Sequence, residues 1–270
     1  MAEIFRDENG IWTDNEHRAI DYPTIGNSLS FSLEENSFWF KHRNNVLLEV
    51  MKRFTFQNNF ADIGGGNGFQ AKFIANHFNS AEVFLIEPGY QGCLNARKRG
   101  LENVYNMMFS KFDFKSNNVT AIGLFDIIEH IEKDCDFLIE LKNKLPKGSI
   151  IYITVPAYNF LWSEMDDIAL HYRRYDLKMI KELSTCAGIE LLYTSCFFSY
   201  LPFLTFFFRS LPYRLKRTKG LNELTKEEKE EHNPSSSLLK IFDFFHNLEL
   251  NKIKHSKVPF GASYIAVLKT

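Results

Sequence analysis

Residues 62–68 read Asp-Ile-Gly-Gly-Gly-Asn-Gly, and this stretch decides the fold. It follows an apolar run at 59–63 that predicts a strand, and it precedes helically spaced apolar residues at 71–78. Glycine is favoured where a backbone approaches a ligand closely or takes a positive φ. The N-terminus of the following helix offers N–H groups that lack partners within the helix. This order predicts a ligand-binding βα unit at the carboxyl end of a strand.

Strands and helices alternate on both sides of this turn. Apolar runs predict further strands at 81–86, 103–108, 120–127, 149–155 and 190–198. Apolar residues at helical spacing predict helices at 34–56, 91–99, 133–145 and 177–187. This alternation predicts a doubly wound α/β fold with a mostly parallel sheet. It stops near residue 198, so a mainly helical insertion at about 199–260, with a helix at 237–253, is expected before a last strand at 262–268.

Residues beside the turn narrow the choice of its ligand. A dinucleotide fingerprint read from Gly64 requires a small residue at position 69, where this chain has Phe69. The carboxylate of Asp62 would repel a pyrophosphate and attract an ammonium group. Glu87 ends the next expected strand, where an acid accepts hydrogen bonds from a ribose diol. The residues therefore favour S-adenosylmethionine, which is zwitterionic and carries a sulfonium, over a dinucleotide.

Three segments together resemble the class I S-adenosylmethionine-dependent methyltransferases. They are the turn at 62–68, the acid Glu87, and Phe-Asp-Ile-Ile-Glu-His-Ile at 125–131. Phe-Trp-Phe-Lys-His-Arg at 38–43 and Pro-Phe-Gly at 259–261 are similar to the subgroup related to ubiquinone-biosynthesis O-methyltransferases. The resemblance implies a Rossmann-like, seven-stranded sheet whose last strand is antiparallel.

The resemblance also implies the domain organisation. It is strong over residues 36–198 and weaker over 199–270. A methyltransferase domain at 36–270, beginning with a helix, is expected behind an N-terminal extension at 1–35. The insertion then serves as a lid, a dimer contact or a membrane-facing element.

By this resemblance, backbone and acidic groups form the cofactor site. Asp62 and the glycines lie along the methionine half of the cofactor, and Glu87 binds the ribose. Met108 and Phe109 enclose the adenine, with Asp113 as an alternative adenine ligand. The cofactor-binding residues expected in this way are Asp62, Gly64, Gly65, Gly66, Gly68, Glu87, Met108, Phe109 and Asp126.

The acceptor site is expected where the fourth and fifth strands end, because ligands bind at the carboxyl ends of parallel strands. The cofactor supplies the electrophile, so the protein positions the reactants and removes a proton from an oxygen or nitrogen acceptor. His130 is the expected general base, with Glu129 beside it and His171 as a second imidazole. Tyr158 and Trp162 are expected to wall this pocket.

Metal binding is an alternative role for the same residues. Asp126, Glu129 and His130 have i, i+3, i+4 spacing, which places them on one face of a helical turn, and His171 can return to the same pocket. Carboxylates and imidazoles suit a divalent ion that lowers the pKa of an acceptor hydroxyl. Some relatives, including small-RNA 2′-O-methyltransferases, have a similar Glu-x-x-Glu-His with a later His. We expect no metal, and these four residues are the alternative metal site.

Two basic stretches have open roles. His42 and Arg43 either face the cofactor carboxylate or form a solvated basic surface. His-Tyr-Arg-Arg-Tyr at 171–175 either binds an acidic or phosphorylated acceptor or forms ion pairs with Glu164, Asp166 and Asp167.

Composition excludes several classes of protein. Apolar residues make up 45% of the 270 residues, which excludes a disordered chain. The 32 basic and 33 acidic residues nearly cancel, so no nucleic acid is expected as a partner. The four cysteines form no C-x-x-C pair, so neither a zinc cluster nor a disulfide framework is expected. No apolar signal region opens the chain and its longest apolar run is too short to span a bilayer, so the expected location is cytoplasmic.

Phenylalanine is unusually common, with 27 residues, six of which lie at 197–208. No acid occurs at 196–220, and basic residues follow the aromatic run. Such a segment is typical of a lid, a homodimer face or a membrane contact through 196–219. It favours an apolar or membrane-near acceptor.

These observations favour an S-adenosylmethionine-dependent methyltransferase that acts on oxygen of a small, lipid-linked or glycan-linked acceptor. A catalytically silent cofactor-binding or partner-binding protein is the alternative. A nucleotide-dependent oxidoreductase is disfavoured by Phe69 and Asp62.

Overall fold

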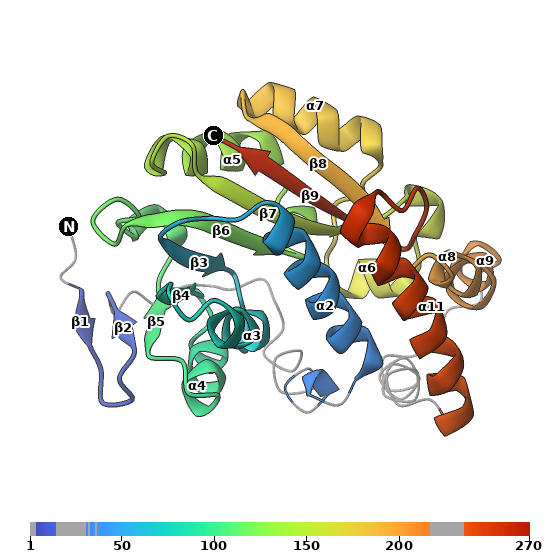
Figure 1. The fold of residues 1–270 in the computed structure, drawn as a ribbon, viewed down its shortest axis with the longest axis horizontal. Helices are drawn as coiled ribbons and strands as arrows, with labels where there is room; N and C mark the ends of the chain where they lie inside the picture. Colours follow the sequence, from blue (N-terminus) through green and yellow to red (C-terminus); the bar gives the residue numbers. More distant parts are fainter. Residues whose placement is uncertain (1–3, 15–30, 32, 36, 217–234) are drawn as a thin grey trace.

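The computed structural model describes residues 4–14, 31, 33–35, 37–216 and 235–270 (Figure 1). Within the expected insertion, the polar and charged stretch at 216–236 lies almost wholly outside the described residues.

A single sheet organises the described residues. Its spatial order is β1-β2-β5-β4-β3-β6-β7-β9-β8. Neighbours from β2 to β7 pair in parallel, whereas β9 runs antiparallel to both β7 and β8. The strands are β1 (Phe5–Arg6), β2 (Trp12–Thr13), β3 (Asn59–Ile63), β4 (Val83–Ile86), β5 (Asn103–Asn106), β6 (Val119–Phe125), β7 (Ile150–Pro156), β8 (Glu190–Phe197) and β9 (Ser263–Lys269).

Helices connect and cover these strands. Helix α2 packs against α3 and α11, and α5 packs against α7. Figure 1 shows α2 and α11 side by side in front of the sheet. The helices are α2 (Phe38–Arg53), α3 (Phe69–His77), α4 (Tyr90–Lys98), α5 (Asp134–Lys144), α6 (Glu164–Ile168), α7 (Leu177–Ala187), α8 (Leu201–Thr205), α9 (Leu211–Arg214) and α11 (Ser236–His255), with short 3₁₀ or π segments η1 (Phe109–Lys111), η2 (Ile128–His130), η3 (Asn159–Leu161) and η4 (Phe206–Ser210).

The mostly parallel sheet with an antiparallel last strand is confirmed. The expected count of seven strands is wrong, because the described residues form nine. The two additional strands are the hairpin β1–β2, which pairs with β5 through Trp12 and Tyr105. Strands of two residues are too short to give a periodic pattern, so the sequence does not predict them.

The sequence predicts no disulfide framework, but the structure has one disulfide. Cys135 of α5 is bonded to Cys186 of α7, and their Cα atoms are 6.2 Å apart. The two cysteines are 51 residues apart in sequence and meet only because α5 and α7 pack together. Cys93 and Cys196 are free and buried.

The end of the aromatic run and the residues after it form one continuous helical stretch at 201–214, in which α8, η4 and α9 follow one another without a gap. Pro202 and Pro212 lie in the first turns of α8 and α9, where proline is tolerated. The π segment η4 joins these two helices. Within the described part of the chain, no helix is long and apolar enough to cross a membrane.

Candidate functional site

One cavity of about 1460 Å³ lies at the carboxyl ends of the central strands. Two groups of residues line it. The first, here called the glycine half, is Asp62, Gly64, Gly65, Gly66 and Glu87. The second, here called the histidine half, is Asp126, Glu129, His130 and His171.

The loop of the glycine half takes positive φ angles, which residues with a side chain adopt only with strain. Gly64, Gly66 and Gly68 have φ of 65°, 51° and 73°. A Cβ on Gly65 would lie 2.4 Å from Leu85 Cδ1. These glycines therefore allow the turn to close tightly over β4 while its surface stays open to the cavity.

Asp62 is the most unusual group of the glycine half. It is 1% exposed, and neither carboxylate oxygen has a hydrogen-bond partner among the described residues. Burial, with a smaller contribution from Glu87, raises the pKa of Asp62 to about 8, although Arg43 opposes the shift. An orphaned buried carboxylate at the edge of a cavity suits a ligand cation.

Glu87 directly follows β4 and holds the glycine loop. Its carboxylate accepts hydrogen bonds from the backbone N–H of Gly66 at 2.9 Å and of Gly89 at 2.6 Å. Burial raises the pKa of Glu87. A carboxylate oxygen has more than one lone pair, so Glu87 can accept further hydrogen bonds from a ligand.

Arg43 of α2 lies between the two halves of the cavity. It forms an ion pair with Asp126, and its guanidinium lies 4.7 Å from the centroid of the Trp39 ring. His42 Nε2 instead donates a hydrogen bond to Glu249 Oε1 of α11 at 2.7 Å, and neither residue lines the cavity. The expectation of a solvated basic surface is wrong, since both residues are buried.

Asp126 does not share a helical turn with Glu129 and His130, the neighbouring members of the histidine half. Its φ is 57°, and the 3₁₀ turn η2 begins only at Ile128. Thr154 of β7 donates a hydrogen bond to Asp126 Oδ1 at 3.1 Å. The i, i+3, i+4 face predicted from the spacing is therefore not formed, and Asp126 turns toward Arg43.

Glu129, His130 and His171 come together, with one potential ligand atom of each within 4.8 Å of the others. Burial, reinforced by the charge of Asp126, raises the pKa of Glu129 well above its usual range, and Glu129 Oε2 has no partner among the described residues. Burial, followed by the effect of His171, lowers the pKa of His130 to about 4. His130 is thus a neutral imidazole at pH 7. The Tyr172 N–H donates to the Glu129 carbonyl at 2.8 Å and holds the two segments together.

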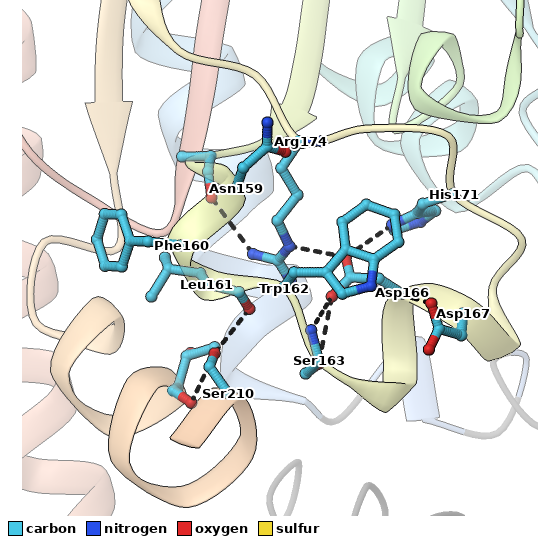
Figure 2. A network of polar contacts seen from close by, with 12 residues as sticks. Asn159, Phe160, Leu161, Trp162, Ser163, Asp166, Asp167, His171, Arg174 and Ser210 are labelled. Atoms are coloured by element: carbon cyan, nitrogen blue, oxygen red, sulfur yellow. Dashed lines mark hydrogen bonds and ion pairs between the residues drawn. The ribbon is translucent and has the colours of Figure 1, made fainter. Parts of the chain in front are cut away.

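Asp166 orients the second imidazole, as Figure 2 shows. It accepts hydrogen bonds from the Ser163 N–H at 2.9 Å and from Arg174 Nε at 2.7 Å, and it contacts His171 Nδ1 at 2.9 Å. Burial raises the pKa of Asp166, but the contacts with His171 and Arg174 outweigh it and lower the pKa to about 2. Asp166 occupies His171 Nδ1, so Nε2 is the nitrogen available to the cavity.

The arginines after His171 form ion pairs within the chain. Arg174 pairs with Asp166, and Arg173 pairs with Asp134 at 2.6 Å. Of the acids expected to form ion pairs with residues 171–175, Asp166 does so. The orienting role of Asp166 was missed, because the sequence does not place one acid between an arginine and a histidine.

Several expected site residues do not line the cavity. Met108 is exposed, Phe109 packs on Phe137, and Asp113 binds Ser116. Tyr158, Trp162 and Gly68 also lie outside the lining. Lining residues that the sequence did not single out are Glu34, Asn67, Gln70, Pro88, Leu201, Leu204, Thr205, Phe208, Leu238 and Phe242.

No family model matches the chain, and no curated protein matches it either. Solved structures do match. Phosphoethanolamine N-methyltransferase 2 of Haemonchus contortus, in complex with S-adenosyl-L-methionine, superposes with a TM-score of 0.55 at 16% identity. The match covers 91% of this chain but only 57% of that one, so this chain spans little more than half the length of that enzyme.

Two plantazolicin methyltransferases, both in complex with S-adenosylhomocysteine, match over almost their whole length. BpumL has a TM-score of 0.56 at 12% identity and covers 92% of this chain and 91% of its own. BamL has a TM-score of 0.52 at 14% identity, with 90% of each chain covered. The fold is that of S-adenosylmethionine-dependent methyltransferases. The substrates of these neighbours differ, so the fold does not assign an acceptor.

Proposed function

We propose that this chain is an S-adenosylmethionine-dependent methyltransferase that methylates an oxygen atom of a small, lipid-linked or glycan-linked acceptor. The observation that carries the proposal is one cavity that contains both an orphaned carboxylate, Asp62, and a cluster of one carboxyl group and two imidazoles. The first suits the cationic end of the cofactor, and the second suits the removal of a proton from an acceptor.

The glycine half fits the cofactor by its donor and acceptor groups. Asp62 would pair with the amino group, the open turn at 64–66 would admit the methionine part, and Glu87 would accept hydrogen bonds from the ribose. When bound, the cofactor supplies an electrophilic methyl group on a sulfonium. Binding by Asp62 requires its ionised form, because only a carboxylate neutralises an ammonium group.

The histidine half fits the removal of a proton. His130 is neutral at pH 7 and can accept the proton of an acceptor hydroxyl. Glu129 and His171 lie close enough to hold the acceptor or to receive the proton next. Asp166 and Arg174 keep His171 in one orientation.

Calorimetry tests the cofactor directly. We expect S-adenosylhomocysteine to bind to the folded chain and NAD not to bind. Binding of NAD alone would favour the oxidoreductase alternative, and failure to bind S-adenosylhomocysteine would contradict the proposal. Binding without methyl transfer to any acceptor would favour the catalytically silent alternative.

A metal role for Glu129, His130 and His171 is the second candidate. It is supported by the unpartnered Glu129 Oε2 beside two imidazoles, a donor set that divalent transition metals accept. Asp126 is engaged by Arg43 and is not part of this donor set. Titration with Mg²⁺, Mn²⁺ and Zn²⁺ should then give heat that Glu129→Gln abolishes. Full methyl transfer after removal of metal by a chelator would contradict the metal role and would leave only the role of His130 as a general base.

A further inference from the structure

The strongest unassigned feature is an apolar surface on the insertion, here called the aromatic face. On α8 and η4, Phe203, Phe207 and Phe208 are 62%, 60% and 69% exposed. On α11, Phe244 is 60% exposed. Exposed aromatic side chains are rarely so concentrated, and larger apolar patches mark interaction sites. The aromatic face consists of Phe203, Leu204, Phe207, Phe208, Leu238, Ile241, Phe244, Phe245 and Leu248.

The two parts of this face belong together. Tyr200, which precedes α8, stacks on Phe242 of α11 at a ring distance of 5.1 Å and also contacts Phe245. Figure 1 shows α8, α9 and α11 at the same end of the molecule. Helix α11 has two sides. His246, Glu249 and Ile253 are buried toward the body, while no described residue covers the exposed apolar side.

The charged residues around the aromatic face indicate which kind of partner it fits. The exposed cations Arg214, Lys216 and Lys240 flank the aromatic face, and the segment at 196–216 has no acid. The exposed Asp243 lies three residues from Lys240 on α11 and offsets its charge, so Arg214 and Lys216 leave the border of the face positive. A symmetric dimer through this face would bring like charges together. An apolar surface bordered by cations is instead complementary to an anionic bilayer.

The cavity reaches the same face. Leu204 and Phe208 on one side and Leu238 on the other line the cavity and are also exposed. The mouth of the proposed acceptor site therefore lies within the aromatic face. An acceptor with an apolar tail would pass from lipid to the histidine half without its tail crossing water.

We propose that the aromatic face docks on an anionic lipid bilayer, with Phe207 and Phe244 inserted at the interface, and that the acceptor is an amphipathic lipid delivered from that bilayer. The acceptor part of this proposal rests on the proposed methyltransferase function, whereas the docking part does not.

Vesicle sedimentation of the full chain tests the docking. The vesicles contain phosphatidylcholine with either no phosphatidylglycerol or about 30% of it. We expect the wild type to bind the anionic vesicles and to bind more weakly as salt is raised to about 0.5 M. The variant Lys216→Glu/Lys240→Glu should lose binding at a lower salt concentration than the wild type. Phe207→Ser/Phe244→Ser should weaken partitioning by more than about tenfold. The matched control Ile4→Ser/Phe5→Ser, which changes exposed apolar residues at the start of β1 and just before it, should leave partitioning unchanged.

Three outcomes would overturn the docking. They are no binding of the wild type to anionic vesicles, an equal loss in the β1 control, or a vesicle-free dimer that Phe207→Ser/Phe244→Ser dissociates. S-adenosylhomocysteine calorimetry on the same variants separates the two proposals, because Phe207 and Phe244 do not line the cavity. If docking holds and S-adenosylhomocysteine does not bind, only the proposed function fails.

Discussion

The two halves of the cavity differ in how the chain builds them. The glycine half comes from two consecutive strand ends, β3 and β4, and its shape is set by backbone conformation. The histidine half joins η2 with the loop after α6, and the insertion closes it from the other side. The first therefore depends on local geometry, and the second depends on packing between distant segments. We expect changes in the two halves to affect different measurements.

The largest expected effect is in the histidine half. His130→Ala should lower methyl transfer by about 10²–10⁴-fold, as removal of a general base does. The affinity for S-adenosylhomocysteine should change by no more than about twofold, because His130 is not in the glycine half. Transfer of labelled methyl to a lipid extract of the source organism measures the first quantity, and calorimetry measures the second.

The exposed His77 on α3 offers a matched control for this variant. His77→Ala should change neither quantity. An equal loss of turnover and of affinity in His130→Ala would mean that the two halves are not separable.

The second effect concerns the contact between α2 and the insertion. Glu249 accepts hydrogen bonds from the backbone N–H groups of Phe198 at 2.8 Å and Ser199 at 2.7 Å, and it pairs with His42. Glu249→Ala leaves these buried groups without a partner, so it should lower the free energy of unfolding by about 3–5 kcal/mol. Glu35, which pairs with Arg99 and is 67% exposed, is the control, and Glu35→Ala should cost less than about 1 kcal/mol. Denaturant unfolding measures the free energy of unfolding of both variants. Similar losses in the two would contradict a buried polar contact at Glu249 that stabilises the packing of α11.

The smallest effect is the pH dependence of the glycine half. The folded pKa of Asp62 is raised to about 8 from 3.8. Between these values the folded state holds a proton that the unfolded state has released, so stability is highest at low pH and falls as pH rises toward 8. Asp62→Asn removes this decline and should stabilise the chain at pH 8 by about 1–3 kcal/mol.

The same substitution should weaken the binding of S-adenosylhomocysteine. In the wild type, that affinity should increase from pH 6 to pH 8, since binding of an ammonium group needs ionised Asp62. Thermal unfolding and calorimetry across this range measure the two trends. A wild-type affinity that falls with rising pH would exclude the proposed partner of Asp62.

The sequence was informative where neighbouring residues make the structure. The strand at 59–63, the glycine turn and the helix Leu177–Ala187 were predicted at their observed bounds, because apolar periodicity and turn residues are local signals. The grouping of Glu129 and His130 followed from adjacency. The return of His171 to the same pocket was also expected, but the backbone contact between Tyr172 and Glu129 that fixes its place cannot be predicted from a local pattern.

Other features depended wholly on tertiary packing. Arg43 meets Asp126 across the cavity, and Cys135 meets Cys186 between two helices. The adenine residues expected at Met108 and Phe109 followed the resemblance, but the structure turns these side chains away from the cavity. Local pattern therefore locates the glycine half well and the histidine half only in part.

A crystal structure of the chain with S-adenosylhomocysteine tests the central claim most directly. The account predicts ribose hydroxyls within about 3 Å of Glu87, the amino group against Asp62, and the sulfur pointing toward His130. A ligand outside the cavity, or one whose sulfur faces away from the histidine half, would contradict it.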